Sequence, residues 1–587
     1  MSIDYKIIFC YNQTIFFFII KINIKYIDAR GVKSLMKLTG AAIIIQTLIQ
    51  HGITEVFGYP GGAVLNIYDE LYKNSDKITH YIFCHEQGAI HAADGYGRAT
   101  GKTGVVIATS GPGATNLVTG IATAYLDSTP MIAITGNVPL DLIGKDSFQE
   151  VDIAGITMPI TKHNYIVKNI NDLEDIVCEA FQIARSGRQG PVLIDVPKDI
   201  QTAECEFKGG IPRSLFKHPK TSPESVDEAV KLINKSTRPY IYAGGGVISS
   251  NACDELKELA EKINAPIGCS MMGLTAADSQ YKYKLGMTGM HGSYAAWKVY
   301  SRADLIIGVG VRFSDRATGN KTKYQEHAKI LHIDIDKSEI GKNVQAYTSL
   351  NGNIKDVLPA LINGIDTKNA NEWQNEIDSY MNEAPVCNDM SCFTPEAIIS
   401  TTCKYAADDT VIVTDVGQHQ IWTAQYYNFS KPRTFLTSGG LGTMGFGMGA
   451  AIGASIGNDR KRTVLFTGDG SFHMNMNEFA SAVMHDIPVI VIVMNNNVLG
   501  MLRQWQHLFF KDRYSNTTVE RRTNYVKLAE SFGGRGYHVT NTDTFEKVIK
   551  KSFNGSEPVI IECLIDKDEK VLPMIPPNGS IDDIIVR

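Results

Sequence analysis

The stretch Thr463-Val-Leu-Phe-Thr-Gly-Asp-Gly-Ser471 decides the fold of the last third of this chain. Its first residues are apolar or β-branched, which is typical of a strand buried on both faces, and they run directly into a Gly-Asp-Gly turn. A second apolar run, Ile487–Met494, ends in Asn495-Asn496-Asn497. The residues between the two motifs suffice for one helix and one strand. The spacing therefore predicts that Asp469 and Asn496 follow neighbouring parallel strands.

Asp469 and Asn496 carry the kind of oxygen atoms that Mg²⁺ prefers, in company with phosphate oxygens. The glycines beside Asp469 allow a diphosphate to approach the main chain closely. The alternative is a tight turn and an Asn-rich loop that bind nothing. Because both the strand context and the spacing fit, we expect a magnesium and diphosphate site at this sheet edge.

The same pattern of a strand followed by a helix recurs along the chain. Further short β-branched runs lie at 104–109, 130–135, 191–196, 240–243, 304–309, 330–335, 410–414 and 558–562. Runs that are apolar at every position indicate parallel sheets with helices on both faces, an α/β doubly wound architecture. Residues 206–224, rich in Pro and Lys, and the polar residues 364–394 are interpreted as linkers. We therefore expect three doubly wound parallel-sheet domains at 36–205, 225–363 and 395–566.

The composition argues against several classes of protein. The 587 residues include 57 Lys and Arg against 62 Asp and Glu, a net charge of −5, so no basic surface for nucleic acid is expected. A mean hydropathy of −0.09 is too polar for a polytopic membrane protein. Ten cysteines without a C-x-x-C pair fit reduced thiols in a cytoplasmic protein. Residues 1–35 contain an apolar run too short to span a bilayer, and we expect them to lie outside the fold.

The pattern around Asp469 and Asn496 resembles the thiamine-diphosphate signature, which consists of Gly-Asp-Gly, a helix and a strand, and then Asn-Asn. Over residues 36–570 the chain resembles the catalytic subunit of the acetohydroxyacid synthase family. The resemblance is carried by Phe57–Ala63, His85–Ala89, Ser110–Asn116, Asp146–Glu150, Gly289–Gly292, Val311–Arg316, Val416–Gln420 and Gly500–Gln506. Many thiamine enzymes share some of these motifs, whereas Arg312–Arg316 and Gln504–Gln506 are more specific to this family.

Glu86 is the candidate catalytic acid. It follows the apolar run Tyr81–Phe83, where a purely structural acid is unexpected. A zinc-protease motif His-Glu-x-x-His would need a second histidine where the chain has Ala89, so a solvated surface glutamate is the remaining alternative. The resemblance implies that Glu86 bonds to N1′ of the cofactor aminopyrimidine and takes part in its proton transfers. The resemblance also adds Gln149 and Lys198 to the catalytic set.

Three cofactors are implied by the resemblance. Thiamine diphosphate would contact Gly62, Glu86, Val416, Gln418, His419, Gly442, Met444, Asp469, Gly470, Ser471, Asn496, Val498 and Met501. Magnesium would be held by Asp469, Asn496 and the backbone carbonyl of Val498. FAD, in a structural role, would contact Arg188, Gly244, Gly245, Gly246, Met290, His291, Arg312, Arg316, Asp334 and Asn353. Asn353 stands where the family usually has Asp, and it can still hydrogen-bond to adenine.

The resemblance also implies the substrates and the assembly. Pyruvate would be decarboxylated and its two-carbon remainder joined to pyruvate or 2-oxobutanoate, the entry to valine, leucine and isoleucine. The substrate residues would be Phe148, Arg316, Leu502 and Trp505. Arg316 offers a bidentate clamp for a carboxylate and Trp505 would favour 2-oxobutanoate, although a surface arginine and a core tryptophan are the alternatives. The family implies a homodimer or tetramer that completes each site across an interface, with a regulatory small subunit.

Other functions remain open from the residues. Gly440-Leu-Gly-Thr-Met-Gly445 matches the dinucleotide fingerprint, with Asp469 further along, which would predict an NAD-dependent dehydrogenase. The preceding Thr434–Thr437 is a poor first strand, and this alternative leaves Asn496 unexplained. Pyruvate oxidase and a flavin-free catabolic synthase are closer alternatives. A flavoprotein without catalytic activity is opposed by the intact Glu86, Asp469 and Asn496.

Overall fold

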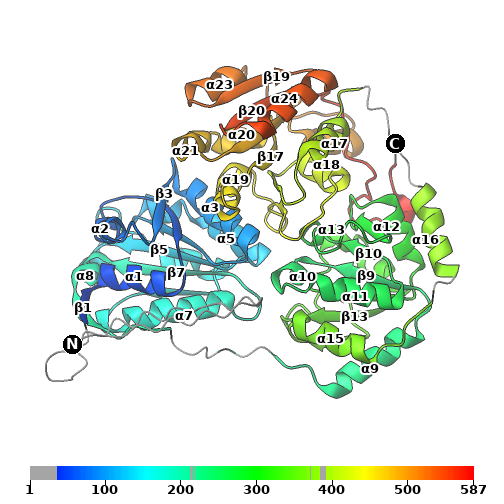
Figure 1. The fold of residues 1–587 in the computed structure, drawn as a ribbon, viewed down its shortest axis with the longest axis horizontal. Coiled ribbons are helices and arrows are strands. Elements are labelled where there is room, and N and C mark those ends of the chain that lie inside the picture. The colour runs from blue at the N-terminus through cyan, green and yellow to red at the C-terminus, as the bar shows by residue number, and fades with distance from the viewer. Residues whose placement is uncertain (1–35, 212–215, 217–218, 370–371, 384–391, 587) are drawn as a thin grey trace, which may run out of the picture.

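The computed structural model describes residues 36–586 except 212–215, 217–218, 370–371 and 384–391. Residues 1–35, expected outside the fold, lie outside this described part. The described residues form three α/β domains, each built on a six-stranded parallel sheet (Figure 1). The predicted fold class, three doubly wound parallel sheets, is confirmed.

The first domain has the strand order β3-β2-β4-β5-β7-β6. Its strands are β2 (Glu55–Tyr59), β3 (Thr79–Ile82), β4 (Gly104–Ala108), β5 (Met131–Asn137), β6 (His163–Ile166) and β7 (Pro191–Pro197). Its principal helices are α1 (Gly40–Gln50), α2 (Leu65–Lys73), α3 (Glu86–Thr100), α5 (Val118–Asp127), α7 (Leu173–Arg185) and α8 (Lys198–Thr202). Ile107 and Ile134 share a core with α1 and α7, whereas Val106 and Ala133 share one with α3 and α5. Burial on both faces explains why these strands are apolar at every position.

Two short segments close the first domain. Strand β1 (Met36–Thr39) pairs antiparallel with β8 (Glu204–Phe207). The side chain of Thr39 then caps α1 by accepting a hydrogen bond from the Ala42 amide at 3.3 Å. The first residues of the predicted linker, 206 and 207, therefore belong to a strand.

The second domain has the strand order β11-β10-β9-β12-β13-β14. Its strands are β9 (Pro239–Ala243), β10 (Ile267–Cys269), β11 (Lys284–Met287), β12 (Leu305–Val309), β13 (Lys329–Asp334) and β14 (Thr348–Asn351). Its helices include α9 (Pro223–Lys235), α10 (Gly245–Ser249), α11 (Cys253–Ile263), α12 (Tyr294–Arg302), α13 (Asp315–Thr318) and α15 (Ile354–Gly364). Ser222 caps α9 with Pro223 in its first turn, the usual chemistry of a helix start.

The third domain has the strand order β16-β15-β17-β18-β20-β19. Its strands are β15 (Val411–Thr414), β16 (Phe435–Leu436), β17 (Thr463–Gly468), β18 (Val489–Asn495), β19 (Arg535–Val539) and β20 (Val559–Leu564). Its helices include α17 (Pro395–Tyr405), α18 (Gln418–Tyr426), α19 (Phe446–Gly457), α20 (Asp469–Asn475), α21 (Glu478–Met484), α22 (Gly500–Phe509), α23 (Tyr525–Ser531) and α24 (Thr542–Asn554). The predicted strand at 487–493 begins two residues later than expected, and its apolar residues all remain buried.

Helices α3 and α19 join the first and third domains, which lie side by side in Figure 1. The contact consists of small residues, so the two backbones approach closely. A Cβ atom at Gly95 would lie 2.2 Å from the Ala450 carbonyl oxygen, and one at Gly453 would lie 1.9 Å from the Ala92 carbonyl oxygen. Larger side chains at either position would push the helices apart. Ala93 of α3 and Ala451 of α19 belong to one continuous hydrophobic core.

Two segments outside the three predicted domains pack against the second domain. Helix α16 (Glu372–Glu383) lies inside the predicted linker 364–394, and its Trp373 and Ile377 are buried in the core of the second domain. Beyond β20 the chain crosses to the second domain, where the Ile575 amide donates to the Met290 carbonyl at 2.8 Å. The end of the chain therefore links the third domain to the second.

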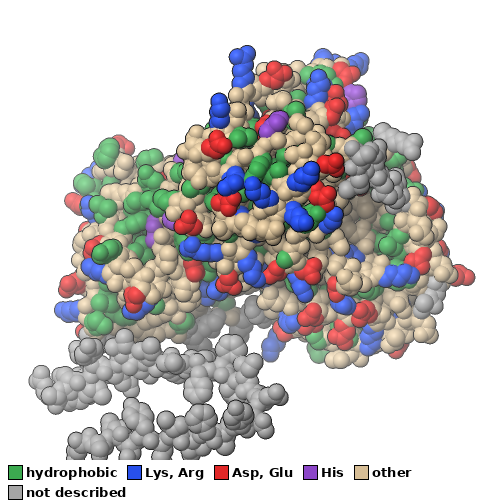
Figure 2. Space-filling view, turned by 45° about the horizontal axis from the view of Figure 1, so that its top comes forward, with side chains coloured by type: hydrophobic (Ala, Val, Ile, Leu, Met, Phe, Trp, Pro, Cys, Tyr) green, Lys and Arg blue, Asp and Glu red, His purple; other side chains and the backbone are tan. Residues whose placement is uncertain are grey.

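One face of the molecule shows how its charged side chains are distributed. On the face in Figure 2, basic and acidic side chains are interspersed and form no broad basic field. Among the described residues, no helix combines the length and the apolar character needed to cross a bilayer.

Candidate active site

Asp469 and Asn496 lie at the carboxyl ends of two adjacent parallel strands, as the spacing predicts. Strands β17 and β18 pair directly, with Gly468 opposite Met494. The carboxylate of Asp469 accepts hydrogen bonds from the backbone amides of Gly470 and Asn496. Burial nevertheless raises the pKa of Asp469 to about 6. A buried carboxylate of this kind favours a bound cation.

The donor set around Asp469 suits magnesium. The side-chain oxygen of Asn496 accepts from the Val498 amide at 3.2 Å, which forms a tight turn directly after β18. Among the residues that the structure describes, no group of three or more His, Cys, Asp or Glu side chains is arranged to hold a metal ion. A metal at this edge would therefore depend on one carboxylate, amide and main-chain oxygens, and oxygens of its ligand. This is the usual environment of phosphate-bound Mg²⁺.

The surrounding loops leave room for a ligand. Gly442 has a φ of +74°, and the nearest atom to a Cβ built there is 4.0 Å away, on Val416. His419 is buried, and its Nε2 has no hydrogen-bond partner. The hydroxyl of Ser471 donates to the Val416 carbonyl at 2.9 Å. An open glycine turn beside an unsatisfied buried imidazole fits a site for a polar group such as a diphosphate ester.

Most residues predicted to contact thiamine diphosphate come from these loops at one edge of the third sheet. They are Val416, Gln418, His419, Gly442, Met444, Asp469, Gly470, Ser471, Asn496, Val498 and Met501. Gln418 connects two of the loops, because its amide nitrogen donates to Gln504 at 3.1 Å and its oxygen lies 3.5 Å from the Asn496 amide. The dinucleotide fingerprint at 440–445 follows β16, a strand of two residues, so it does not have the context of a first Rossmann turn.

Glu86 is the first residue of α3 and is 9% exposed. One carboxylate oxygen accepts from the Asn116 amide at 2.9 Å. Placement at a helix N-terminus stabilises its negative charge. Gly62, in the same domain, has open space around it, since no atom lies within 4 Å of a Cβ built there. No hydrogen bond within the described part of this single chain connects Glu86 to Asp469 or Asn496.

Glu478 is a site residue that the sequence analysis missed. It is fully buried at the start of α21 and accepts hydrogen bonds from the Cys84 amide at 3.0 Å, from the His85 amide and from the Ser481 hydroxyl at 2.6 Å. An acid of the third domain thus holds the turn that leads into Glu86. Its position shortly after α20 carries no sequence signal, because its partners in the first domain, Cys84 and His85, are almost 400 residues away.

Arg316 and Trp505 meet, although they come from different domains. The Arg316 guanidinium lies 5.6 Å from the centre of the Trp505 ring, and its Nη1 is 3.5 Å from the Met290 sulfur. The Arg316 side chain is 61% exposed, so it can reach a ligand. The indole nitrogen of Trp505 is buried without a partner. His291 lies beside this cluster, and burial lowers its pKa to about 4.

The other predicted substrate and catalytic residues are not brought to this cluster by any contact within the described residues. Phe148 is 89% exposed and precedes Gln149, which has a φ of +60° and packs its backbone against Gly111. Lys198 is the first residue of α8. Leu502 is 55% exposed and lies one helical turn before Trp505 on α22.

The residues predicted to contact FAD, apart from Arg188 of the first domain, lie at or after the carboxyl ends of strands of the second sheet. Gly244 and Gly246 press against Gly310, since a Cβ at Gly244 would lie 2.0 Å from the Gly310 carbonyl oxygen. Close packing of the backbone against Gly310 therefore explains why these two positions are glycine, without a bound ligand. At the end of β13, burial raises the pKa of Asp334 to about 6.

Three further members of the FAD set already have partners within the chain. Arg188 donates to Glu339 at 2.9 Å. Asn353 caps α15 by accepting from the Lys355 amide at 3.1 Å. The carbonyl of Arg312 accepts from Asn343 at 3.1 Å. Gly245 and Asp334 lie at the carboxyl ends of their strands, which is a suitable place for a nucleotide. Arg188 would have to release Glu339 before it could bind a phosphate.

Comparison with known proteins identifies the chain at the level of its family. Its residues 38–156, 226–361 and 415–563 match the N-terminal TPP binding, the central and the C-terminal TPP binding domains of thiamine pyrophosphate enzymes. The chain is 41% identical to the acetolactate synthase isozyme 2 large subunit of Escherichia coli, covering 94% of this chain and 100% of that protein. It is 43% identical to the probable acetolactate synthase large subunit of Methanocaldococcus jannaschii (93% and 95%) and 42% identical to the acetolactate synthase large subunit of Corynebacterium glutamicum (93% and 90%). Identity at this level over nearly the whole length shows that the chain belongs to the acetolactate synthase large-subunit family of thiamine pyrophosphate enzymes.

Proposed function

We propose that this chain decarboxylates pyruvate and joins the two-carbon remainder to a second 2-oxo acid, either pyruvate or 2-oxobutanoate. The products are 2-acetolactate and 2-aceto-2-hydroxybutanoate, the precursors of valine, leucine and isoleucine. The observation that carries the proposal is the placement of Asp469 and Asn496 at adjacent strand ends, beside an open glycine loop. When bound, thiamine diphosphate supplies a carbon nucleophile and a sink for the electrons left by decarboxylation.

The chain's own residues have distinct roles in this proposal. Asp469, Asn496 and the Val498 carbonyl would hold Mg²⁺, which neutralises the diphosphate. Glu86, oriented by Asn116, would hold a proton at the pyrimidine nitrogen N1′. Since no hydrogen bond joins Glu86 to Asp469 among the described residues, we propose that the site is completed by a second copy in a homodimer or tetramer. Three relatives are named large subunits, which supports a regulatory small subunit as a further partner.

The proposal also includes FAD as a bound cofactor and the cytoplasm as the location of the protein. Gly245 and Asp334 at the edge of the second sheet support a flavin nucleotide with a structural role. Cys178, Cys269 and Cys563 are buried free thiols, which suits a reducing cytoplasm. Phe148, Gln149, Lys198 and Leu502 would line the substrate access to the completed site.

The proposed function is tested by measuring acetolactate formed from pyruvate with thiamine diphosphate and Mg²⁺, in the presence and absence of FAD. We expect acetolactate without oxygen consumption, and more of it with FAD. Equal activity without FAD would favour the flavin-free catabolic synthase, and oxygen consumption would favour pyruvate oxidase. Saturable binding of NAD in place of thiamine diphosphate would favour the dehydrogenase. Failure to form any acetolactate with all cofactors present would refute the proposal.

Trp505 is expected to set the preference for the second substrate. Trp505→Leu removes the aromatic wall beside Arg316, so the extra methylene of 2-oxobutanoate loses its contact. A single methylene in an apolar pocket is worth at most about 10- to 200-fold, and we expect the preference for 2-oxobutanoate to fall about tenfold. The measurement is the ratio of the two products when both substrates compete.

The matched control is Phe509→Leu, one turn further along α22. Its ring contacts Trp505 at 5.8 Å between centroids, whereas the Arg316 guanidinium lies over the Trp505 ring itself. We expect the control to keep the product ratio of the unaltered chain. An unchanged ratio in Trp505→Leu would remove Trp505 from the acceptor site.

A further inference from the structure

Three charged side chains form a buried cluster at the junction of the first and third domains. Arg98 on α3 bonds to Asp94, one turn earlier, and to Asp127 at 2.9 Å, at the end of α5. The side chains of Asp94 and Asp127 are 0% exposed, and that of Arg98 is 10% exposed. We call these residues the Arg98 cluster. A charge so well buried is stable only when its remaining donors and acceptors are satisfied.

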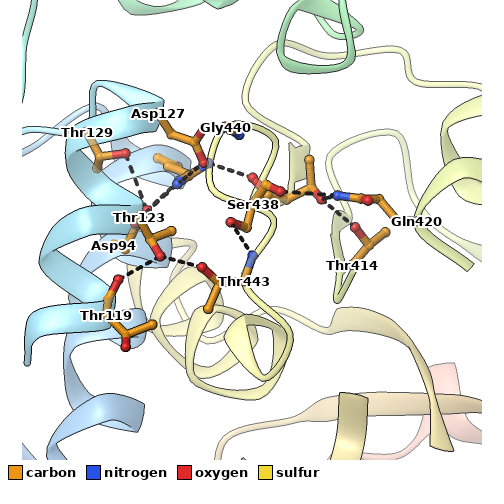
Figure 3. A network of polar contacts seen from close by, with 12 residues as sticks. Asp94, Thr119, Thr123, Asp127, Thr129, Thr414, Gln420, Ser438, Gly440 and Thr443 are labelled. Atoms are coloured by element: carbon orange, nitrogen blue, oxygen red, sulfur yellow. Dashed lines mark hydrogen bonds and ion pairs between the residues drawn. The ribbon is translucent and has the colours of Figure 1, made fainter. Parts of the chain in front are cut away.

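The Arg98 cluster is completed by the main chain of the third domain. The remaining guanidinium nitrogen, Nη1, donates to the Thr437 carbonyl at 2.7 Å. The Asp127 carboxylate accepts from the Gly440 amide at 2.7 Å. Figure 3 shows Asp127 reaching Gly440 across the boundary between the domains. One donor and one acceptor of the cluster therefore hold two points of the loop 437–443.

The tip of this loop is held through its main chain: a Cβ atom at Gly440 would lie 3.0 Å from Leu126, and one at Gly439 would lie 2.4 Å from the Met272 sulfur. Residues 439–442, Gly-Gly-Leu-Gly, are exposed, and three glycines contribute no side-chain packing. The two sides of the loop are fixed separately: the Thr443 amide donates to the Ser438 hydroxyl at 3.0 Å, and Thr443 contacts Thr123 at 2.8 Å (Figure 3). A glycine-rich segment loses much conformational freedom when it is ordered. The Asp127 contact to Gly440 orders the tip in advance.

We propose that Arg98 and Asp127 are positioning residues that hold the loop 437–443 in its ligand-binding conformation. The proposal rests on the proposed function, in which Gly442 of this loop and Met444, the residue directly after it, line the cofactor. Neither Arg98 nor Asp127 touches the cofactor in this proposal. They act through Thr437 and Gly440. Because these contacts already order the loop in the free protein, cofactor binding costs less conformational entropy.

Two readouts test the proposal in the full-length protein. The first is amide hydrogen exchange of residues 437–444 without cofactor, which reports the loop alone. The second is titration with thiamine diphosphate at saturating Mg²⁺, followed by protein fluorescence. Asp127→Ala removes the acceptor for Gly440. We expect the amide exchange rate of the loop to rise about tenfold, because local opening of an exposed loop needs little free energy. Half-saturation should need about tenfold more thiamine diphosphate, because binding must then order the loop. The turnover number at saturating cofactor should stay within about threefold of the unaltered chain, because the loop is ordered once cofactor is bound.

Asp127→Asn is the conservative variant, because an amide oxygen can still accept from Gly440. We expect it to restore most of the loop protection and cofactor affinity. Tyr81→Phe is the matched control at the same domain boundary, because it removes only the hydroxyl to which Arg460 donates at 3.3 Å. It should change neither readout.

Three outcomes would overturn the positioning role. They are unchanged loop exchange in Asp127→Ala, failure of Asp127→Asn to restore protection, and a rise in exchange throughout α3 and α19, which would indicate general loosening of the domain boundary. If the unaltered chain shows the expected loop exchange but binds no thiamine diphosphate, the cofactor assignment fails while the positioning of the loop stands.

Discussion

Glu86→Ala is expected to lower the turnover number of acetolactate formation by about 10²- to 10⁴-fold, the usual contribution of a general acid–base group. The carboxylate is 9% exposed, oriented by Asn116 and located at a helix N-terminus, and the alanine variant removes it without moving the backbone that carries it. Affinity for thiamine diphosphate should fall less, because the diphosphate is held in the third domain. The measurement is steady-state kinetics at saturating cofactor.

The control for Glu86→Ala is Asp69→Ala, which removes an exposed carboxylate paired with Lys73 in the same domain. This control should retain full activity, since exposed ion pairs contribute little. Melting temperature and flavin absorbance of Glu86→Ala should match those of the unaltered chain. Near-normal turnover in Glu86→Ala would eliminate the proton-transfer role.

Asp469→Ala is expected to abolish Mg²⁺-dependent retention of thiamine diphosphate. Asp469 is the only carboxylate proposed as a ligand of the magnesium, so its loss leaves the protein with only neutral oxygens to offer the divalent cation. We expect the affinity for cofactor with Mg²⁺ to fall by at least about 100-fold, because removing a residue that merely supports a metal ligand already costs about 10- to 100-fold. The measurement is cofactor remaining after gel filtration, together with Mg²⁺ titration of binding.

Asp409→Ala is the matched control for Asp469→Ala. Asp409 lies in the same domain and pairs with Lys461 on the surface, where the two side chains are 50% and 52% exposed. It should retain cofactor normally. If Asp469→Ala held thiamine diphosphate as tightly as this control, the ligand role of Asp469 would be wrong.

The sequence predicted the sheets and the meeting of Asp469 with Asn496 because both depend on local pattern. A strand buried on both faces is apolar throughout, and the carboxyl ends of parallel strands share one edge. Helix α16 was missed because few of its residues are apolar, although Trp373 and Ile377 make a buried contact. Its amphipathic spacing could have revealed it.

The polar contacts between domains could not be predicted in the same way. Arg98 and Asp94 are spaced as an ordinary surface pair on a helix, one turn apart, and nothing local indicates that Asp127 and Thr437 complete their bonding. Glu478 likewise has no recognisable sequence pattern, because its partners Cys84 and His85 belong to a different domain. Arg316 and Trp505 were connected by resemblance, and only the folded chain places the guanidinium over the indole.

The small-residue contact between α3 and α19 has a consequence for synthesis on the ribosome. Helix α3 ends at Thr100 and its partner begins at Phe446, so the central domain is translated between them. At about 5–20 residues per second, roughly 20–70 s pass before the emerging chain can cover the Gly- and Ala-rich stripe of α3. The apolar surface of α3 in the nascent first domain therefore stays exposed during this time. It is buried only after the third domain has left the exit tunnel.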